Sequence, residues 1–364
     1  MFYYLVYGIC TFLGFLVDAA NKDVKNTGKT KYISEIGFFA ISLVLFLLGA
    51  LRYFVGVDYA LYLDRYIPQV LMGIPDAVEP GFKWIILIGS FFGNFQWIYA
   101  LTQLVIVLLV SYSIKHHSNS IGWSVFFLTF GTYINLAFSI MRQTIATGIF
   151  LFSLKYLFDK KPIKFLICIM IAALFHKSAL FFLPVIIFMY IPFNRIVFLG
   201  IIVGSAILKG SLQSILLSIF EKMGEYEGYI TDFNGRTGTS GVLLLEILPV
   251  TLLIIYLMFS KNYDKLKNSR RLPVLMYLQS ISTSILIFSN VLPQFERTVM
   301  MVSFSNIIML PLLFPMIERK NTRIIVKAIF VAIYLIVFFQ TVIVKSGTGS
   351  YPFRFIFWPN TFLY

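Results

Sequence analysis

The stretch LRYFVGVDYALY, residues 51–62, gathers side chains that could do chemistry directly after a long apolar segment. Arg52 could bind an anion, and Asp58 could accept a proton or bind a sugar hydroxyl. Tyr59 and Tyr62 follow closely, and Asp58 and Tyr62 would share a helix face because they lie four residues apart. The alternative is an interfacial belt, in which the arginine and tyrosines lie among lipid headgroups and an Arg–Asp pair closes a loop.

Two further arginines stand at the start of apolar segments. Arg142 and Gln143 open one segment in SIMRQTIATG, and Arg297 follows Glu296 in LPQFERTVM. An arginine at membrane depth costs free energy unless it is paired or solvated, which favours a functional role. A helix start also offers free N–H groups and a partial positive charge, so these arginines suit a diphosphate. The alternatives are a snorkelling arginine at position 142 and a Glu296–Arg297 surface pair.

His176 and Ser178 lie in ALFHKSALFFLP, within an apolar region. Imidazole exchanges protons near neutral pH, so His176 could act as a general base or donate to a phosphate. The alternative is a histidine that only packs and forms hydrogen bonds. His116 and His117 fall on the opposite side of the predicted topology, so the sequence predicts no metal site. Nucleotide-binding motifs are absent from it as well, and we expect no cofactor.

The composition places these residues in a membrane protein. The chain has 364 residues, of which 59% are hydrophobic and 13% charged, with a formal net charge of +14. Apolar runs recur from end to end, which predicts an all-α, polytopic bundle forming a single multi-pass domain over residues 1–364. The basic residues lie between the apolar runs, so the charge indicates membrane orientation and no nucleic-acid partner. Cys10 and Cys168 fall inside apolar runs and are expected to pack.

The apolar runs predict about twelve transmembrane segments. In the region 84–112, FFGNF indicates a re-entrant segment or a half helix before the span, and 163–192 could form two short segments or one long, kinked one. The expected segments are 3–19, 34–51, 84–112, 122–138, 143–158, 163–176, 178–192, 196–218, 242–259, 272–290, 299–316 and 324–344.

The positive-inside rule orients these segments. An outside N-terminus assigns most lysines and arginines to cytoplasmic loops, and most acidic residues to the outside. Both termini then lie outside the cytoplasm, as do the two longest polar loops, about 52–83 and 219–241. All the candidate residues above reach the outer face, so Arg52, Arg142 and Arg297 are expected to converge there.

These stretches, taken in order, resemble the EpsG family of Wzy-type polysaccharide polymerases. The motifs that carry the resemblance are LRYFVGVDYALY, EPGF at 79–82, MRQTIATGIFLFSLKYL at 141–157, LFHKSALFFLPV at 174–185 and FERT at 295–298. The resemblance implies an enzyme of the bacterial plasma (inner) membrane that joins undecaprenyl-diphosphate-linked repeat units into O-antigen, capsule or exopolysaccharide. A chain-length regulator and a flippase are possible partners.

The chemistry of such a transfer suggests roles for the candidate residues. Cationic side chains can stabilise a departing lipid diphosphate, which suits Arg142 and Arg297, assisted by Arg52. Either Asp58 or His176 would take the acceptor proton, and the sequence does not choose between them. The remaining candidates for substrate binding are Tyr59, Tyr62, Glu79, Gln143 and Ser178.

Three other functions fit parts of the pattern. An O-antigen ligase or another polyprenyl-phosphate-dependent glycosyltransferase would show the same outward arginines, and only the order of the motifs separates it. A polysaccharide flippase or other transporter would favour inverted repeats and polar residues near mid-membrane. An acyltransferase acting on sugar would require a histidine near the membrane centre.

Overall fold

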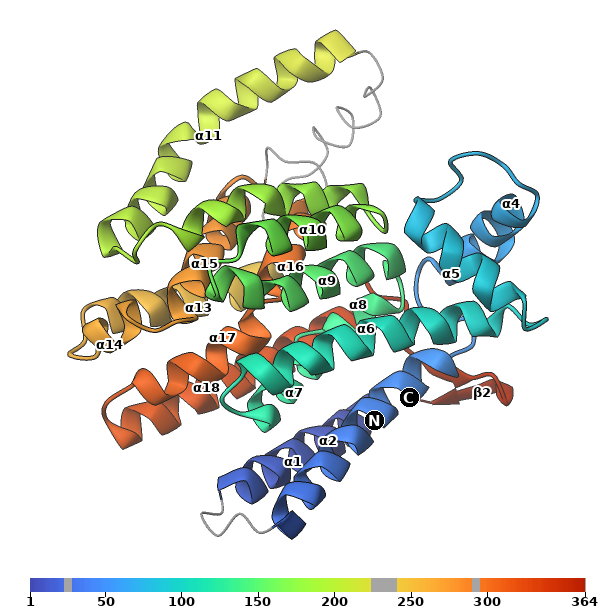
Figure 1. Cartoon of the computed structure of the whole chain (residues 1–364), viewed down its shortest axis with the longest axis horizontal. Helices are drawn as coiled ribbons and strands as arrows, with labels where there is room; N and C mark the ends of the chain where they lie inside the picture. Colours follow the sequence, from blue (N-terminus) through green and yellow to red (C-terminus); the bar gives the residue numbers. More distant parts are fainter. Residues whose placement is uncertain (23–27, 224–240, 290–294, 364) are drawn as a thin grey trace.

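The computed structural model describes residues 1–22, 28–223, 241–289 and 295–363 as a bundle of helices with one small β-hairpin (Figure 1). Helices form because a backbone in lipid must satisfy its N–H and C=O groups within its own segment. The first half of the chain forms α1 (Phe2–Lys22), α2 (Gly28–Ala50), α3 (Tyr59–Leu61), the π-helix η1 (Tyr62–Tyr66), α4 (Ile67–Leu71), α5 (Pro80–Ser90), α6 (Gln96–His117), α7 (Ile121–Phe130), α8 (Tyr133–Ala137), α9 (Met141–Phe158), α10 (Pro162–Ala173) and the 3₁₀ helix η2 (Lys177–Met189).

The second half completes the bundle and adds the hairpin. Its elements are α11 (Arg195–Met223), α13 (Gly241–Met258), α14 (Tyr263–Lys267), α15 (Leu272–Ile287), α16 (Phe295–Ser303), α17 (Asn306–Leu313), the 3₁₀ turn η3 (Phe314–Met316), α18 (Lys320–Phe338), the π-helix η4 (Phe339–Val344), β1 (Phe353–Phe355) and β2 (Trp358–Leu363).

Each of the twelve expected segments coincides with helical structure. Five helices of the described chain are long and apolar enough to cross a membrane, namely α1, α2 from Thr30, α6, α13 and α18 extended through η4. The bent pair α16–α17 raises the count to six, and α7, α10, η2 and α15 are shorter apolar helices. The protein is therefore a polytopic membrane bundle that combines long helices with shorter apolar ones.

The structure resolves the two ambiguous regions. In 84–112, the half helix α5 precedes the long helix α6, and a short break at 91–95 separates them. In 163–192, α10 and η2 form a pair of antiparallel segments that turn at Phe175 and His176. Both arrangements bring a helix end to the same side of the bundle, which is where the candidate residues lie.

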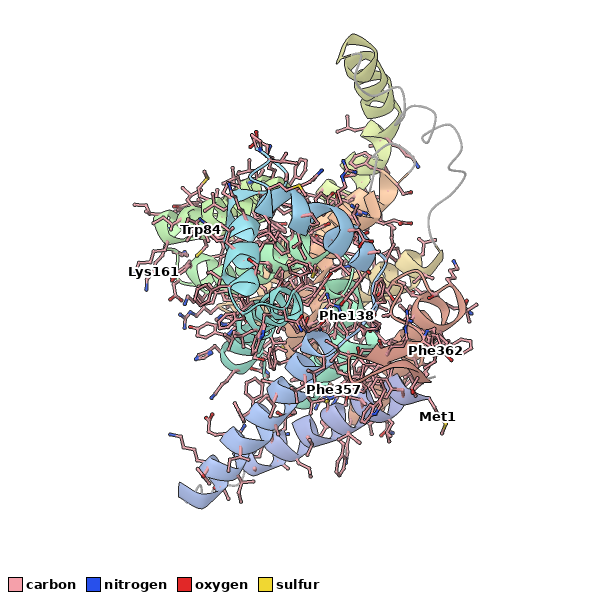
Figure 2. All side chains as sticks on the ribbon, turned by 90° about the vertical axis from the view of Figure 1, so that its right-hand side faces the viewer. Met1, Trp84, Phe138, Lys161, Phe357 and Phe362 are labelled. Carbon is pink, nitrogen blue, oxygen red and sulfur yellow. The ribbon has the colours of Figure 1, made fainter. Side chains whose placement is uncertain are left out.

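One end of the bundle, called the site end here, collects the ends of α2, α6 and α9. The Nε2 atom of Gln96, at the start of α6, donates to the carbonyl oxygen of Ala50 at 2.6 Å. Arg52, just beyond α2, donates to the sulfur of Met141, the first residue of α9, at 3.1 Å. This end lies to the right in Figure 1 and faces the viewer in Figure 2, where Trp84 of α5 lies at the periphery.

The opposite end, called the basic end here, is held by ion pairs between loops and helix ends. Lys115 of α6 pairs with Glu35 of α2, and Arg270 pairs with Asp159, which follows α9. Arg271 donates to the carbonyl oxygen of His117 at 2.6 Å. The long helices thus have a basic end and a chemically mixed end, which is the charge pattern expected of an oriented membrane protein.

The C-terminal residues form a small β-hairpin beside the helices of an otherwise all-α structure. Strands β1 and β2 pair antiparallel, and Phe355 also bridges to Arg52. Before the hairpin, the segment 346–352 crosses the site end, where the carbonyl oxygen of Ser350 accepts a hydrogen bond from the Tyr3 hydroxyl at 2.7 Å. This segment contains no long apolar run. It is held in place by hydrogen bonds to distant parts of the chain, such as those from Tyr3 and Ser139.

Candidate functional site

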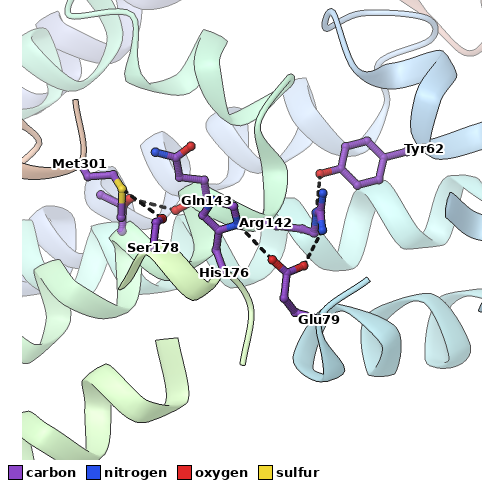
Figure 3. Close-up of polar contacts among 8 residues, drawn as sticks. Tyr62, Glu79, Arg142, Gln143, His176, Ser178 and Met301 are labelled. Atoms are coloured by element: carbon purple, nitrogen blue, oxygen red, sulfur yellow. Dashed lines mark hydrogen bonds and ion pairs between the residues drawn. The ribbon is translucent and has the colours of Figure 1, made fainter. Parts of the chain in front are cut away.

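Glu79 is the centre of a polar cluster at the site end (Figure 3). One carboxylate oxygen forms an ion pair with the Nη1 atom of Arg142, and the other lies 3.1 Å from the Nδ1 atom of His176. Burial raises the pKa of Glu79, but the hydrogen bond from His176 and the charge of Arg142 outweigh it and hold the pKa at about 2. Glu79 is therefore a carboxylate at neutral pH.

The sequence EPGF explains how Glu79 reaches His176. Glu79 has extended backbone geometry before α5, and Pro80 occupies the first helical position, where its missing N–H costs nothing. Gly81 donates its N–H to the carbonyl oxygen of Leu174 at 2.8 Å. A Cβ at position 81 would lie 2.9 Å from that oxygen, so glycine allows α5 to approach the turn that carries His176.

Arg142 lies between Glu79 and two tyrosines. Its Nε atom donates to the Tyr62 hydroxyl at 3.3 Å, and its guanidinium carbon lies 4.9 Å from the ring centre of Tyr66. A guanidinium has five N–H donors, and the contacts with Glu79 and Tyr62 occupy two of them. Since 20% of the side chain is exposed, the remaining donors are available to an anion.

Asp58 faces both arginines of the cluster. Burial raises the pKa of Asp58, and the charges of Arg297 and Arg142 oppose that rise. Asp58 precedes α3, but its side chain forms no capping hydrogen bond. Asp58 is partly buried, and its carboxylate is a candidate proton acceptor or partner for sugar hydroxyls.

The turn before Asp58 depends on a glycine. Gly56 has a φ of +112°, and a Cβ there would clash with the carbonyl oxygen of Phe138. The N–H of Val57 bonds to the Ser139 hydroxyl at 3.0 Å and to the carbonyl oxygen of Thr348 at 3.3 Å. The loop that carries Asp58 is thus fixed against the segment preceding α9.

Gln143 connects α9 to the start of α16. Its Nε2 atom donates to the carbonyl oxygen of Arg297 at 3.0 Å, while the Arg297 side chain is exposed. Ser178 lies nearby on η2 and donates to the sulfur of Met301 at 3.4 Å (Figure 3). Gln143 and Ser178 therefore join three elements around the cluster, and Gln143 fixes the backbone from which Arg297 projects.

Arg52 does not join this cluster, which corrects the expectation that three arginines converge. Its side chain is completely buried, and it donates to the carbonyl oxygens of Gly49 at 3.0 Å and Phe138 at 3.3 Å. The rings of Tyr99 and Phe138 lie 5.1 and 5.0 Å from the guanidinium carbon. A completely buried guanidinium whose Nη atoms already donate to carbonyl oxygens cannot reach a lipid diphosphate, so Arg52 holds the ends of α2 and α9 together beside Arg142.

Tyr59 also packs away from the cluster. Its ring stacks on Tyr99 with a centroid distance of 4.3 Å, and its hydroxyl donates to Gln96 at 3.3 Å. Tyr62, one turn later, is the tyrosine that contacts Arg142. The shared face of Asp58 and Tyr62 is observed, because the Tyr62 N–H bonds to the Asp58 carbonyl oxygen at 3.0 Å.

The described residues contain no group of three His, Cys, Asp or Glu side chains arranged to hold a metal ion. His116 and His117 lie at the basic end, separated from His176 by the length of the bundle. The predicted outer loop 219–241 lies mostly outside the described residues, which resume at Gly241. Tyr66 and Met301 are site contacts that the sequence did not indicate, because ordinary aromatic and apolar residues carry no signal of their own.

A comparison with protein families places the chain. The model of the EpsG family matches residues 35–355, a range that contains Glu79, Arg142, His176 and Arg297. No curated protein and no solved structure gave a significant match. The protein belongs to the EpsG family, and it is a multi-pass membrane protein associated with exopolysaccharide biosynthesis.

Proposed function

We propose that this protein is a polysaccharide polymerase that joins undecaprenyl-diphosphate-linked repeat units at the outer face of the bacterial plasma membrane. The observation that carries the proposal is the cluster at the site end, where cationic groups and proton acceptors meet. Arg142 and Arg297 supply positive charge, and Asp58 and the Glu79–His176 pair supply oxygen and nitrogen acceptors. Family membership supports the same conclusion.

The transfer needs one bond to form and one to break. The oxygen of an acceptor sugar hydroxyl bonds to the anomeric carbon of the growing glycan, while the bond from that carbon to the diphosphate oxygen breaks. The hydroxyl proton passes to a base, and the electron pair of the broken bond leaves with the lipid diphosphate. Positive charge beside the leaving group lowers the barrier because negative charge accumulates there in the transition state.

We assign the base to His176. Since Glu79 is ionised, it can only accept, so Nδ1 of His176 carries the proton that Glu79 binds. The Nε2 atom then presents its lone pair, and the imidazole is held in one tautomer and orientation, as in other carboxylate–histidine pairs. Asp58 would bind hydroxyls of the incoming sugar, with the two arginines beside it.

Arg297 and Arg142 are assigned to the lipid diphosphate. Arg297 is exposed on the first turn of α16, where the helix start adds a partial positive charge. Arg142 keeps donors available while Glu79 and Tyr62 hold its guanidinium in place. Two guanidiniums from distant parts of the chain would bind two phosphates, with Tyr62 and Ser178 at the edges of the site.

The orientation of the bundle forms part of the proposal. The basic end would lie in the cytoplasm and the site end outside, with twelve passes and both termini outside. The close approach of Phe2 to Phe353, with ring centres 5.0 Å apart at the site end, supports placing both chain ends on one side. A chain-length regulator and a flippase would then be partners in the same membrane.

The variant Arg142→Ala tests the function. It should remain in the membrane but stop chain growth, so that cells carry single repeat units on their lipid. Arg195→Ala is the matched control, because Arg195 also begins an apolar helix but lies at the opposite end. The measurement is the length distribution of surface polysaccharide by gel electrophoresis. Long polymer from Arg142→Ala would overturn the diphosphate role, and single units retained on the inner leaflet would indicate a flippase instead.

A further inference from the structure

A second cavity lies at the basic end, away from Glu79. Its volume is about 510 Å³, and it lies between α1, the start of α7, the α17–η3 bend and α18. The residues that shape its chemistry are Phe15, Asp18, Lys22, Trp123, Phe314 and Lys327.

The cavity carries an excess of positive charge. Lys327 and Lys22 both line it, and Arg323 lies close enough to repel the charge of Lys327. The Lys327 ammonium lies 5.2 Å from the ring centre of Trp123 and 5.6 Å from that of Phe314. Within the described part of the chain, neither lysine forms an ion pair with a carboxylate.

The carboxylate that lines the cavity is already occupied. Asp18 accepts hydrogen bonds from the Ser120 hydroxyl at 2.5 Å, the Ile121 N–H at 2.7 Å and the Gly122 N–H at 3.0 Å. It therefore caps the start of α7 and is directed to that helix. Among the described residues, Asp18 is the carboxylate that lines the cavity, so an anion bound there would offset the repulsion between the two lysines.

The surroundings indicate a lipid as the source of that anion. Helices α1 and α18 are both long enough to span a membrane, and the cavity lies between their basic ends. Near it, Leu16 of α1 and Ile324 of α18 are exposed, as expected of surfaces in contact with acyl chains. Basic pockets between membrane helices on the cytoplasmic side are suited to anionic headgroups.

We propose that this cavity binds the phosphate of an anionic phospholipid, with Lys22 and Lys327 as its ligands and Trp123 and Phe314 as its walls. The bound lipid would join α1 to α18 and α7, and so stabilise the bundle at the end opposite the site. Assignment to the cytoplasmic leaflet rests on the proposed orientation, whereas binding itself does not depend on catalysis.

The test measures thermal unfolding of the purified full-length protein in neutral detergent. Phosphatidylglycerol is titrated in, with phosphatidylcholine and inorganic phosphate as separate arms. We expect phosphatidylglycerol alone to raise Tm. Lys22→Gln and Lys327→Gln should each raise, by about fivefold, the phosphatidylglycerol concentration that gives half of the maximal Tm rise. A fivefold change corresponds to the loss of about 1 kcal/mol of binding free energy per lysine. Lys320→Gln is the control, because this exposed lysine on α18 does not line the cavity.

Native mass spectrometry provides a second measurement that does not depend on the variants' stability. Wild-type protein should retain a phosphatidylglycerol molecule that Lys22→Gln and Lys327→Gln lose and Lys320→Gln keeps. An equal Tm rise with inorganic phosphate would overturn the lipid assignment. Equal responses of all three variants to phosphatidylglycerol would overturn the site.

Discussion

The Nδ1 atom of His176 lies 3.1 Å from the Oε1 atom of Glu79, although 97 positions of sequence separate the two residues. The contact exists because α5 and η2 both begin at the site end and Gly81 lets their backbones approach. Through the other oxygen of Glu79, the imidazole is also coupled to Arg142. The proposed base and one proposed diphosphate ligand therefore share a single carboxylate.

Replacing Glu79 should show whether this carboxylate positions His176 for proton transfer or only stabilises the fold. We expect Glu79→Gln to lower the polymerisation rate by about 10²-fold or more, because an amide can donate to Nδ1 and favour the wrong tautomer. The pH dependence of the rate should change as well, and Glu79→Asp should restore part of the activity. Purified protein supplied with lipid-linked units gives the rates.

Glu296→Gln is the control for this change, since Glu296 is exposed on α16 and the same charge is removed. A Glu79→Gln protein with an unchanged rate and pH profile would refute the dyad.

Arg52 should matter for stability more than for substrate binding. Arg52→Lys keeps the charge but lacks the planar fork whose two Nη atoms bond the carbonyl oxygens of Gly49 and Phe138. We expect a loss of about 1–3 kcal/mol in the free energy of unfolding, seen as a lower Tm, with the KM of the folded fraction for lipid-linked donor unchanged. A variant with normal Tm and a raised KM would show that Arg52 binds substrate directly.

The ion pairs of Glu79 predict a pH dependence of stability. The pKa of Glu79 is about 2, below its ordinary value of 4.5, so the folded state favours the carboxylate. The resulting stabilisation, on the order of 3 kcal/mol, is present above pH 4.5 and is lost as the pH falls toward 2.

Thermal unfolding of wild type and Glu79→Gln between pH 7 and 3 measures this dependence. The difference in Tm between the two proteins should be constant down to about pH 5 and shrink below it. A difference that does not change with pH would contradict the depressed pKa.

The proposed orientation can be tested by labelling single introduced cysteines. Met72 is 77% exposed in the loop before α5 at the site end, and Lys320 is exposed at the basic end. An impermeant thiol reagent should label Met72→Cys in intact cells, and Lys320→Cys only after lysis. Cys10 and Cys168 are buried, so background labelling should be low. The reverse pattern would overturn the topology.

The sequence predicted the helices well and the roles of individual polar residues less well. Long apolar runs bounded by charge are local signals, so every expected segment proved helical. The burial of Arg52 depends on a distant contact, because its guanidinium donates a hydrogen bond to the carbonyl oxygen of Phe138, 86 positions away. Local sequence cannot distinguish such a buried arginine from an exposed one such as Arg297.

In the candidate site too, local motifs indicated residues, whereas their contacts depend on tertiary structure. The motifs contain Glu79, Arg142 and His176, which the structure brings into contact. The role of Glu79 as the link between the other two depends on how α5 packs on the turn at Leu174, which is a tertiary contact. The hairpin β1–β2 lacked a strong periodic pattern, because three- and six-residue strands are too short to produce one.

The C-terminal segment has a consequence for biogenesis. The loop before Asp58 donates backbone hydrogen bonds to the carbonyl oxygens of Thr348, Gly349 and Arg354, residues that the ribosome adds nearly three hundred positions later. Until they emerge, the loop lacks these supports while the earlier helices are already inserting. A nascent chain of this protein therefore fixes the loop that carries Asp58 only late in translation, after the helices around Glu79 and Arg142 have been made.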